Sequence, residues 1–190
     1  RTLAAANESD ICLLVLDATQ LGTSQDLHIA GQIMDAGKGF IIVVNKYDAL
    51  EKDDKTQAKL LRKLHYEFDF LTWAPVVFTS ATQGLNVTKL FDLITEINER
   101  RTTKLTTAEL NTWLRKMALS HPPAGLKNRH PKLNYITQTS TNPPEFTVFG
   151  SHIEFLHWSY KRYLENEIRK AYDFTGTAVR FIFKDKHKQK

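Results

Sequence analysis

The chain has 190 residues, of which 42% are hydrophobic and 25% carry a charge, proportions that are ordinary for a globular protein and exclude a disordered or fibrous class. No apolar run approaches the roughly 18 residues of a membrane span and the N-terminus has no signal-peptide pattern, so we expect neither a membrane segment nor export. The single cysteine, Cys12, excludes an internal disulfide, and a cytoplasmic location fits.

Charge divides the chain into two unlike halves. Residues 1–101 carry 11 Lys and Arg against 14 Asp and Glu, a net charge of −3, whereas residues 102–190 carry 15 against 7, a net charge of +8. A basic half indicates a polyanionic partner. RNA is favoured over a membrane, because no basic amphipathic helix with a Trp or Leu face stands out, and a solvated basic surface is the plainer alternative.

The first half alternates strands with amphipathic helices. Near-continuous apolar runs, typical of strands covered on both faces, occupy residues 11–16, 40–44 and 76–78. This alternation predicts an α/β fold with a parallel sheet, whose ligands bind at the carboxyl ends of the strands. The helical stripes are formed by Leu27, Ala30, Ile33 and Met34, by Leu60, Leu61, Leu64 and Phe68, and by Val87, Leu90, Phe91, Ile94 and Ile97.

The tetrapeptide Asn45-Lys46-Tyr47-Asp48 directly follows the second apolar run. A fixed carboxylate such as Asp48 can accept two hydrogen bonds from the N1–H and the exocyclic amine of guanine, whereas adenine would leave that charge unpaired. Asn45 would tie the loop together, and the Lys46 stem would lie across the base. The motif therefore predicts recognition of a guanine base, with an ordinary surface loop as the alternative.

The third apolar run ends in small polar residues, Thr79-Ser80-Ala81-Thr82. Small side chains allow backbone N–H groups to approach a ligand closely. Because the carboxyl ends of parallel strands meet at one edge of a sheet, we expect this segment to lie near Asp48. The alternative is an ordinary strand end.

No stretch of the chain fits a phosphate loop, its magnesium-binding Ser or Thr, or a switch that senses the γ-phosphate. The nearest approach, Gly31 to Gly39, has the wrong spacing and runs from a helix into a strand, and Asp173-Phe-Thr-Gly176 is interpreted as a turn. The histidines lack metal-ligand spacing, and no Ser-His-Asp or Cys-His set is apparent. We therefore expect neither catalytic residues nor metal ligands in this chain.

A second domain is predicted to begin after Arg101, giving domains at residues 1–101 and 102–190. A capping box, Thr106 to Glu109, predicts a helix through about Leu119. Next come strands at 132–139 and 146–149 joined by the Asn142-Pro143-Pro144 turn, a long helix and a strand at 178–183. This order predicts a small α+β domain. The long helix carries Trp158, Tyr160, Tyr163, Leu164, Ile168 and Tyr172.

Basic side chains of the second half are candidates for contact with RNA or a ribosome. The candidates are Lys127, Arg129, Lys132, Lys161 and Arg162. Binding through such side chains is expected to be sensitive to salt. For the pair Lys161 and Arg162, a solvated helix face or an interdomain contact are the alternatives.

Several segments together carry a family resemblance: Leu14-Val-Leu-Asp17-Ala, Gln25-Asp-Leu27, Gly31, Ala36-Gly-Lys, Asn45 to Asp48, Tyr160-Lys-Arg-Tyr-Leu-Glu-Asn166 and Phe174-Thr-Gly-Thr177. With them the chain resembles the Der (EngA) family of bacterial tandem GTPases over essentially its whole length. The resemblance is to the trailing part of the second GTPase domain joined to the C-terminal KH-like domain.

This resemblance implies an incomplete P-loop GTPase domain and a role in GTP-dependent assembly of the large ribosomal subunit. It implies that GTP or GDP is bound by Asn45, Lys46, Asp48, Ser80 and Ala81, with the Ala81 N–H donating to the base oxygen. Mg²⁺ would be a cofactor only of the full-length protein, and this fragment alone would be inactive. The implied partners are the large ribosomal subunit or its rRNA and the protein's own missing GTPase domains.

One departure affects the RNA hypothesis. Ordinary KH domains clamp nucleotides with a Gly-x-x-Gly loop, whereas the candidate stretch Gly150-Ser-His-Ile153 has no second glycine. A third hypothesis is an Era-like GTPase, which also pairs a GTPase domain with a KH domain. It predicts the Gly-x-x-Gly loop, so the same departure argues against it. The second hypothesis is a non-catalytic module that binds rRNA or a partner and uses no nucleotide. A phosphate loop encoded upstream of Arg1 would favour the GTPase, and a start codon near Arg1 would favour the module.

Overall fold

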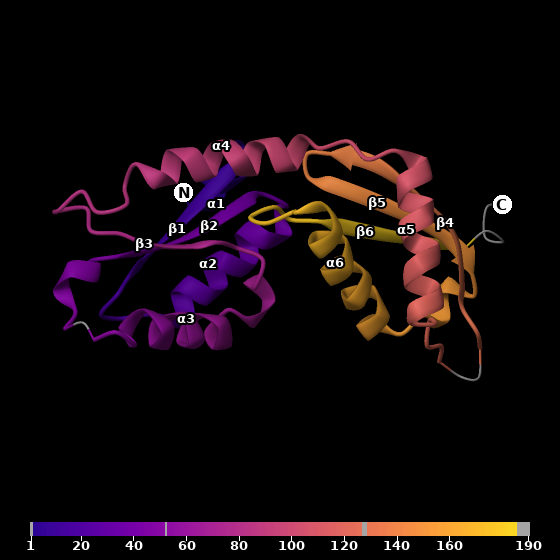
Figure 1. Cartoon of the computed structure of the whole chain (residues 1–190), viewed down its shortest axis with the longest axis horizontal. Helices are drawn as coiled ribbons and strands as arrows, with labels where there is room; N and C mark the ends of the chain where they lie inside the picture. Colours follow the sequence, from indigo (N-terminus) through magenta and orange to yellow (C-terminus); the bar gives the residue numbers. More distant parts are fainter. Residues whose placement is uncertain (1, 52, 127–128, 186–190) are drawn as a thin grey trace. The chain divides into compact units, whose positions relative to one another are not determined.

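The computed structural model describes residues 2–51, 53–126 and 129–185, and it divides into two compact units (Figure 1). The first unit contains the described residues up to Arg100 together with Thr175–Ala178. The second contains the described residues from Arg101 to Phe174 and from Val179 onward. Nowhere in these three described stretches is there a helix long and apolar enough to cross a membrane.

The first unit is built around a three-stranded parallel sheet in the order β1-β2-β3, which confirms the predicted α/β class. In the register of the sheet Asp17 lies opposite Asn45, and Val44 opposite Phe78. The carboxyl ends of the strands therefore meet at one edge. The elements are α1 (Thr2–Glu8), β1 (Ile11–Asp17), α2 (Ser24–Asp35), β2 (Gly39–Asn45), η1 (Tyr47–Ala49), α3 (Thr56–Glu67), η2 (Asp69–Leu71), β3 (Val76–Phe78) and α4 (Lys89–Thr102).

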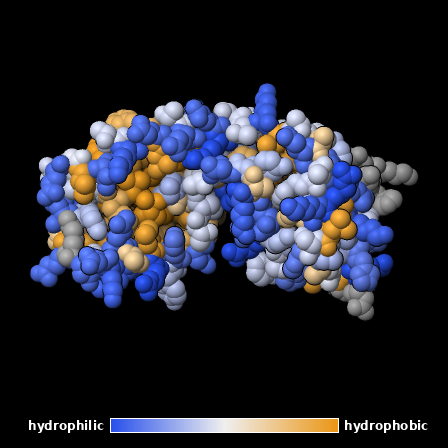
Figure 2. All heavy atoms as spheres, in the orientation of Figure 1, coloured by the Kyte–Doolittle hydropathy of each residue, from blue (hydrophilic) through white to orange (hydrophobic). Residues whose placement is uncertain are grey.

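The central strand β2 is covered on both faces, as its sequence predicts. Phe40, Ile42 and Val44 pack in one cluster with residues of α2 and α3, while Ile41 and Val43 pack with Ile97 of α4 on the other face. Figure 2 shows hydrophobic residues gathered on the face of this unit between α4 and α3. Residues 40–44 of β2 therefore bury apolar side chains on both faces of the sheet.

Two details of the predicted core are wrong. Phe91 was expected on the buried stripe of α4, yet it is 68% exposed, because the stripe that packs on β2 is formed by Leu90, Leu93, Ile94 and Ile97. The strand β1 was expected to be covered on both faces. Instead its side chains alternate: Cys12, Leu14 and Leu16 pack in the core, whereas Leu13 and Val15 on the opposite face are exposed.

The second unit is a small α+β fold around a sheet in the order β4-β5-β6. Strands β4 and β5 form an antiparallel hairpin, but β5 and β6 are parallel and are connected through α6. The unit therefore contains one parallel βαβ crossover, which was not predicted. Its elements are α5 (Thr107–Ser120), β4 (Lys132–Thr141), β5 (Pro144–Ser151), η3 (Ile153–Phe155), α6 (Trp158–Tyr172) and β6 (Arg180–Asp185).

Local signals set the boundaries of these elements. The predicted capping box is confirmed: the Glu109 N–H donates to the Thr106 hydroxyl at 3.3 Å, and the Thr106 N–H donates to the Glu109 carboxylate at 3.0 Å. The hairpin strands extend further than expected, so that Pro144 already belongs to β5. Gly150, the candidate for an RNA-clamping loop, lies inside β5, paired with Leu133.

Residues 175–178 belong to the first unit, although the residues on either side of them in the sequence belong to the second. The Phe40 N–H donates to the Gly176 carbonyl, and the Gly176 N–H donates to the Trp73 carbonyl, both at 2.8 Å. Gly176 has φ 73°, and a Cβ atom there would lie 2.6 Å from Cγ1 of Ile97. The strand β6 consequently begins at Arg180, two residues later than predicted.

Candidate functional site

Asn45 joins the two predicted loops at the carboxyl edge of the first sheet. Its side-chain oxygen accepts hydrogen bonds from the Ala81 N–H at 3.0 Å and from the Thr79 hydroxyl at 3.2 Å. The backbone reinforces this connection, because the Tyr47 N–H donates to the Thr79 carbonyl at 3.0 Å. The loops that follow β2 and β3 are therefore held side by side.

Asp48 lies in the short 3₁₀ turn η1, half-buried, and faces the second loop. The Thr82 hydroxyl donates to its Oδ2 at 3.4 Å. Thr82 was not among the expected ligand residues, although the sequence places it in the same small-residue segment. The contact positions the carboxylate beside the turn that contains Ala81, where it can accept hydrogen bonds from a base edge.

Ser80 is fully buried and acts within its own turn. Its hydroxyl lies 3.1 Å from the Thr82 hydroxyl and accepts from the Gln83 N–H at 3.2 Å. The Ser80 backbone pairs with Leu85 in an isolated bridge. The side chain of Ser80 therefore shapes the loop, and the exposed Ala81 presents the backbone N–H at its surface.

Lys46 is exposed, adopts a left-handed conformation with φ 60°, and pairs with Asp17. Its Nζ lies 2.6 Å from Oδ2 of Asp17, whose Oδ1 accepts from the N–H and hydroxyl of Thr19 at 2.9 and 2.7 Å. The hydrogen bond from Lys46, followed by those from Thr19, lowers the pKa of Asp17 to about 2, and Asp17 in turn raises the pKa of Lys46.

Asp17 was not among the residues predicted for this site. Its position as the last residue of β1, directly opposite Asn45 in the register, is the signal that could have found it. This register brings the carboxylate to the edge from which Lys46 emerges. The ion pair then fixes the ammonium group at the carboxyl edge of the sheet.

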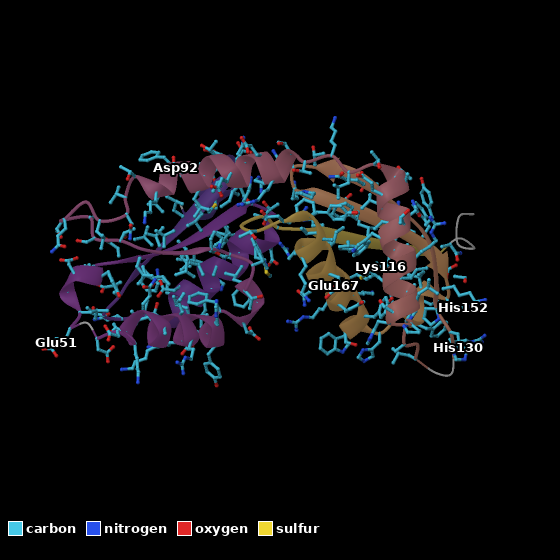
Figure 3. All side chains as sticks on the ribbon, viewed as in Figure 1. Glu51, Asp92, Lys116, His130, His152 and Glu167 are labelled. Carbon is cyan, nitrogen blue, oxygen red and sulfur yellow. The ribbon has the colours of Figure 1, made fainter. Side chains whose placement is uncertain are left out.

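The groups at this edge suit a purine with donors on its Watson–Crick side, because Asp48 offers a carboxylate and Ala81 a backbone N–H. Among the residues that the structure describes, no group of His, Cys, Asp and Glu is arranged to hold a metal ion. His130 and His152, labelled in Figure 3, belong to the second unit and are not residues of this site.

Three of the basic candidates in the second unit lie over aromatic rings. The guanidinium of Arg129 is 5.8 Å from the ring centroid of Phe155, that of Arg162 is 5.8 Å from the Trp158 ring, and Nζ of Lys161 is 5.2 Å from the Phe183 ring. Lys132 is exposed at the start of β4, and Lys127 lies outside the described residues. The aromatic partners of these cations were not expected from the sequence.

Family comparisons divide the chain at nearly the same place as its contacts do. The family described as the Elongation factor Tu GTP binding domain matches residues 1–100. The family described as the KH-domain-like of EngA bacterial GTPase enzymes, C-terminal, matches residues 104–184.

Curated relatives align along the whole chain. GTPase Der from Chloroflexus aggregans is 41% identical over 190 residues, which cover 100% of this chain and 42% of that protein. GTPase Der from Desulfitobacterium hafniense is 42% identical, with 100% and 43% covered. The chain thus spans less than half the length of these relatives. Among solved structures, Era from Aquifex aeolicus bound to GDP.AlF4- has 20% identity and a TM-score of 0.44, covering 96% of this chain and 67% of that one.

Proposed function

Because this chain belongs to the Der (EngA) family of GTP-binding proteins, we propose that residues 1–101 recognise the guanine base of GTP or GDP within a longer GTPase. The observation that carries the proposal is the Asn45 side chain, whose oxygen joins the loop containing Asp48 to the turn containing Ala81. The longer protein would supply the phosphate loop and the Mg²⁺ site.

Each site residue has a distinct role in this proposal. Asp48 accepts hydrogen bonds from the N1–H and the amine of guanine, and Asn45 holds the two loops together. Ser80 shapes the turn. Ala81 donates its N–H to the base oxygen, a donor that the base would share with Asn45. The Lys46 stem lies along the base face while its ammonium stays with Asp17.

Energetics indicate that these contacts select the nucleotide and that the phosphate contacts hold it. Two or three base hydrogen bonds of about 0.5 to 1.5 kcal/mol each, or up to about 3 kcal/mol when charged, amount to a few kcal/mol. A binding free energy of roughly 4 kcal/mol corresponds to a Kd near 1 mM, so the base contacts alone give an affinity of about that value or weaker. Tight binding and hydrolysis are therefore properties that we assign to the full-length protein.

The Asp48→Asn substitution in the full-length protein tests this assignment. An amide can donate to the carbonyl that xanthine carries in place of the guanine amine, so preference should move from GTP to XTP. Competition binding with the two nucleotides measures the change. Asp54→Asn is the matched control, because Asp54 is an exposed acid in the following loop. Unchanged preference for GTP in Asp48→Asn would refute the role of Asp48.

For residues 102–190 we propose binding to rRNA during GTP-dependent assembly of the large ribosomal subunit, which would place the longer protein in the cytoplasm. The net charge of +8 supports this proposal. The cations over Phe155, Trp158 and Phe183 support it further, because rings and guanidinium groups are what unpaired bases stack on. The protein's other GTPase domains would be its second partner.

A further inference from the structure

We infer that Trp158, Arg162, Phe155 and Arg129 form a stacking platform for the unpaired bases of single-stranded RNA. The inference rests on the proposed RNA partner of the second unit and adds to it a specific surface and a class of RNA. It requires no Gly-x-x-Gly loop, which the sequence lacks.

Trp158 is the central element of this platform. It is the first residue of α6 and is 61% exposed, an unusual degree for the largest side chain. Arg162, one helical turn later, places its guanidinium 5.8 Å from the ring centroid of Trp158. The ring of His157 lies 5.6 Å away on the preceding residue. An exposed indole flanked by cationic and aromatic groups is a surface on which a base can stack.

The second ring–cation pair lies in an adjoining segment. The Leu126 N–H donates to the Phe155 carbonyl at 2.9 Å, and the His157 N–H donates to the Ala124 carbonyl at 3.2 Å. These bonds join the loop that carries Arg129 to the residues directly before Trp158. Arg129 then places its guanidinium 5.8 Å from the ring centroid of Phe155. The two ring–cation pairs are thus carried by segments that backbone hydrogen bonds hold together.

Charge and base geometry indicate which ligand binds this platform. Each ring has a guanidinium group over it, from Arg129 or Arg162, in the half of the chain with a net charge of +8, so a polyanion complements them. Glu167, labelled on α6 in Figure 3, is paired with Lys170 at 2.6 Å. Bases of a duplex are already stacked on each other and cannot cover the Trp158 ring, whereas splayed bases of a single strand can.

Anisotropy of a fluorescein-labelled 12-nucleotide single-stranded RNA and of the corresponding 12-base-pair duplex, titrated with the 190-residue chain at low salt, tests the platform. We expect Trp158→Leu to weaken single-strand binding by about tenfold, within a range of roughly 5- to 150-fold, and to leave duplex binding unchanged. Trp158→Phe, which keeps a ring, should retain most of the affinity. Tyr66→Leu removes a ring that is 84% exposed on α3, and it should change neither single-strand binding nor duplex binding.

Tryptophan fluorescence supplies a second readout. The chain has three Trp residues, and Trp113 is buried while Trp73 is half-buried. Stacking on exposed Trp158 should therefore quench the emission of the wild type and not that of Trp158→Leu.

The outcomes separate this inference from the proposed function. If Trp158→Leu binds the single strand as the wild type does, or loses single strand and duplex equally, the platform is overturned while the RNA partner stands. If the wild type binds neither RNA at low salt, both proposals fail. Selective loss of single-strand binding in Trp158→Leu, restored in Trp158→Phe, supports both.

Discussion

At the scale of single residues, the arrangement of the candidate base site depends on side chains that bridge neighbouring strands. Asn45 links the loops after β2 and β3, and Asp17 at the end of β1 holds Lys46. Both are possible because the parallel register places the last residues of the strands side by side. The Lys46 ammonium is thus positioned by a carboxylate from a strand that is distant in sequence.

The Asp17–Lys46 pair gives a prediction about pH. The pKa of Asp17, about 2, lies below its ordinary value of 3.8. The pair therefore contributes stability that is fully present above pH 4 or so and is lost as the pH falls toward 2. In Lys46→Met the pKa of Asp17 should rise toward 3.8 without reaching it, because Thr19 keeps both of its hydrogen bonds. NMR titration of the Asp17 carboxyl carbon measures this.

A matched control is Lys59→Met. Lys59 pairs with Asp53 at 2.9 Å in an exposed position, and its loss should leave the titration of Asp17 unchanged. An Asp17 that still titrates near 2 in Lys46→Met would show that Thr19, and not the ion pair, controls this carboxylate.

At the scale of elements, helix caps stabilise each unit locally. The helix α5 begins at a reciprocal cap in which Thr106 and Glu109 satisfy each other's backbone N–H groups. The Thr106 hydroxyl, which donates to the Glu109 carboxylate at 2.7 Å, and then the Thr106 N–H lower the pKa of Glu109. The cap thereby directs α5 so that Leu110 and Leu114 enter the core of the second unit.

Thr106→Ala should lower the free energy of unfolding of the second unit by about 1 kcal/mol, within roughly 0.5 to 2, because a side-chain cap is lost. Urea unfolding followed by tryptophan fluorescence, to which the buried Trp113 on α5 contributes, measures the change. The pKa of Glu109 should rise in the same variant. Thr107→Ala, one residue later and exposed, is the control and should change stability by less than about 0.5 kcal/mol.

The returning segment at residues 175–178 gives a second prediction at this scale. Gly176→Ala would have to keep a left-handed φ of 73° and to place Cβ 2.6 Å from Cγ1 of Ile97 and 3.3 Å from Cδ of Pro75. We expect a loss of about 1 to 3 kcal/mol in the free energy of unfolding, from strain and overpacking. Thermal unfolding measures it.

Gly31→Ala provides the contrast. A Cβ at Gly31 meets nothing within 4 Å, and the residue lies inside α2. Alanine should therefore be neutral or stabilise by up to about 1 kcal/mol. Equal effects of the two substitutions would indicate that the Gly176 segment does not pack on the first unit in solution.

At the scale of the whole molecule, the proposed functions assign selection of a base to the first half of the chain and binding of a polyanion to the second. Residues 1–101 combine a net charge of −3 with a small set of directed hydrogen bonds, and residues 102–190 combine a net charge of +8 with exposed rings. Directed hydrogen bonds discriminate between bases, whereas clustered cations mainly increase affinity and are screened by salt.

RNA binding by the chain should accordingly fall steeply with salt. If Arg129, Lys132, Lys161 and Arg162 neutralise about four phosphates, the slope of log K against log salt should be about −3, or roughly 50-fold between 50 and 200 mM. Arg162→Met should make the slope shallower by about 0.7. Lys63→Met, in the first unit, should leave it unchanged. A flat response in the wild type would contradict a phosphate-contacting role for the second unit.

Much of this protein was determined by sequence alone, because the relevant signals are local. The apolar run of β2, the Asn45 to Asp48 motif that follows it and the Thr106 to Glu109 cap depend on residues within a few positions of each other. Each was predicted in the place where the structure has it. The same local signals predicted the parallel sheet of the first half and its joined carboxyl edge.

Only the tertiary structure decided the contacts between distant segments. The pairing of Lys46 with Asp17, the joining of Asn45 to Ala81 and the return of Gly176 to β2 all depend on strand register and on chain paths across tens of residues. The exposure of Phe91 and Trp158 likewise depends on which face of a helix finds a partner. An amphipathic pattern predicts that a helix has an apolar face, but packing decides which aromatic rings remain at the surface to bind a ligand.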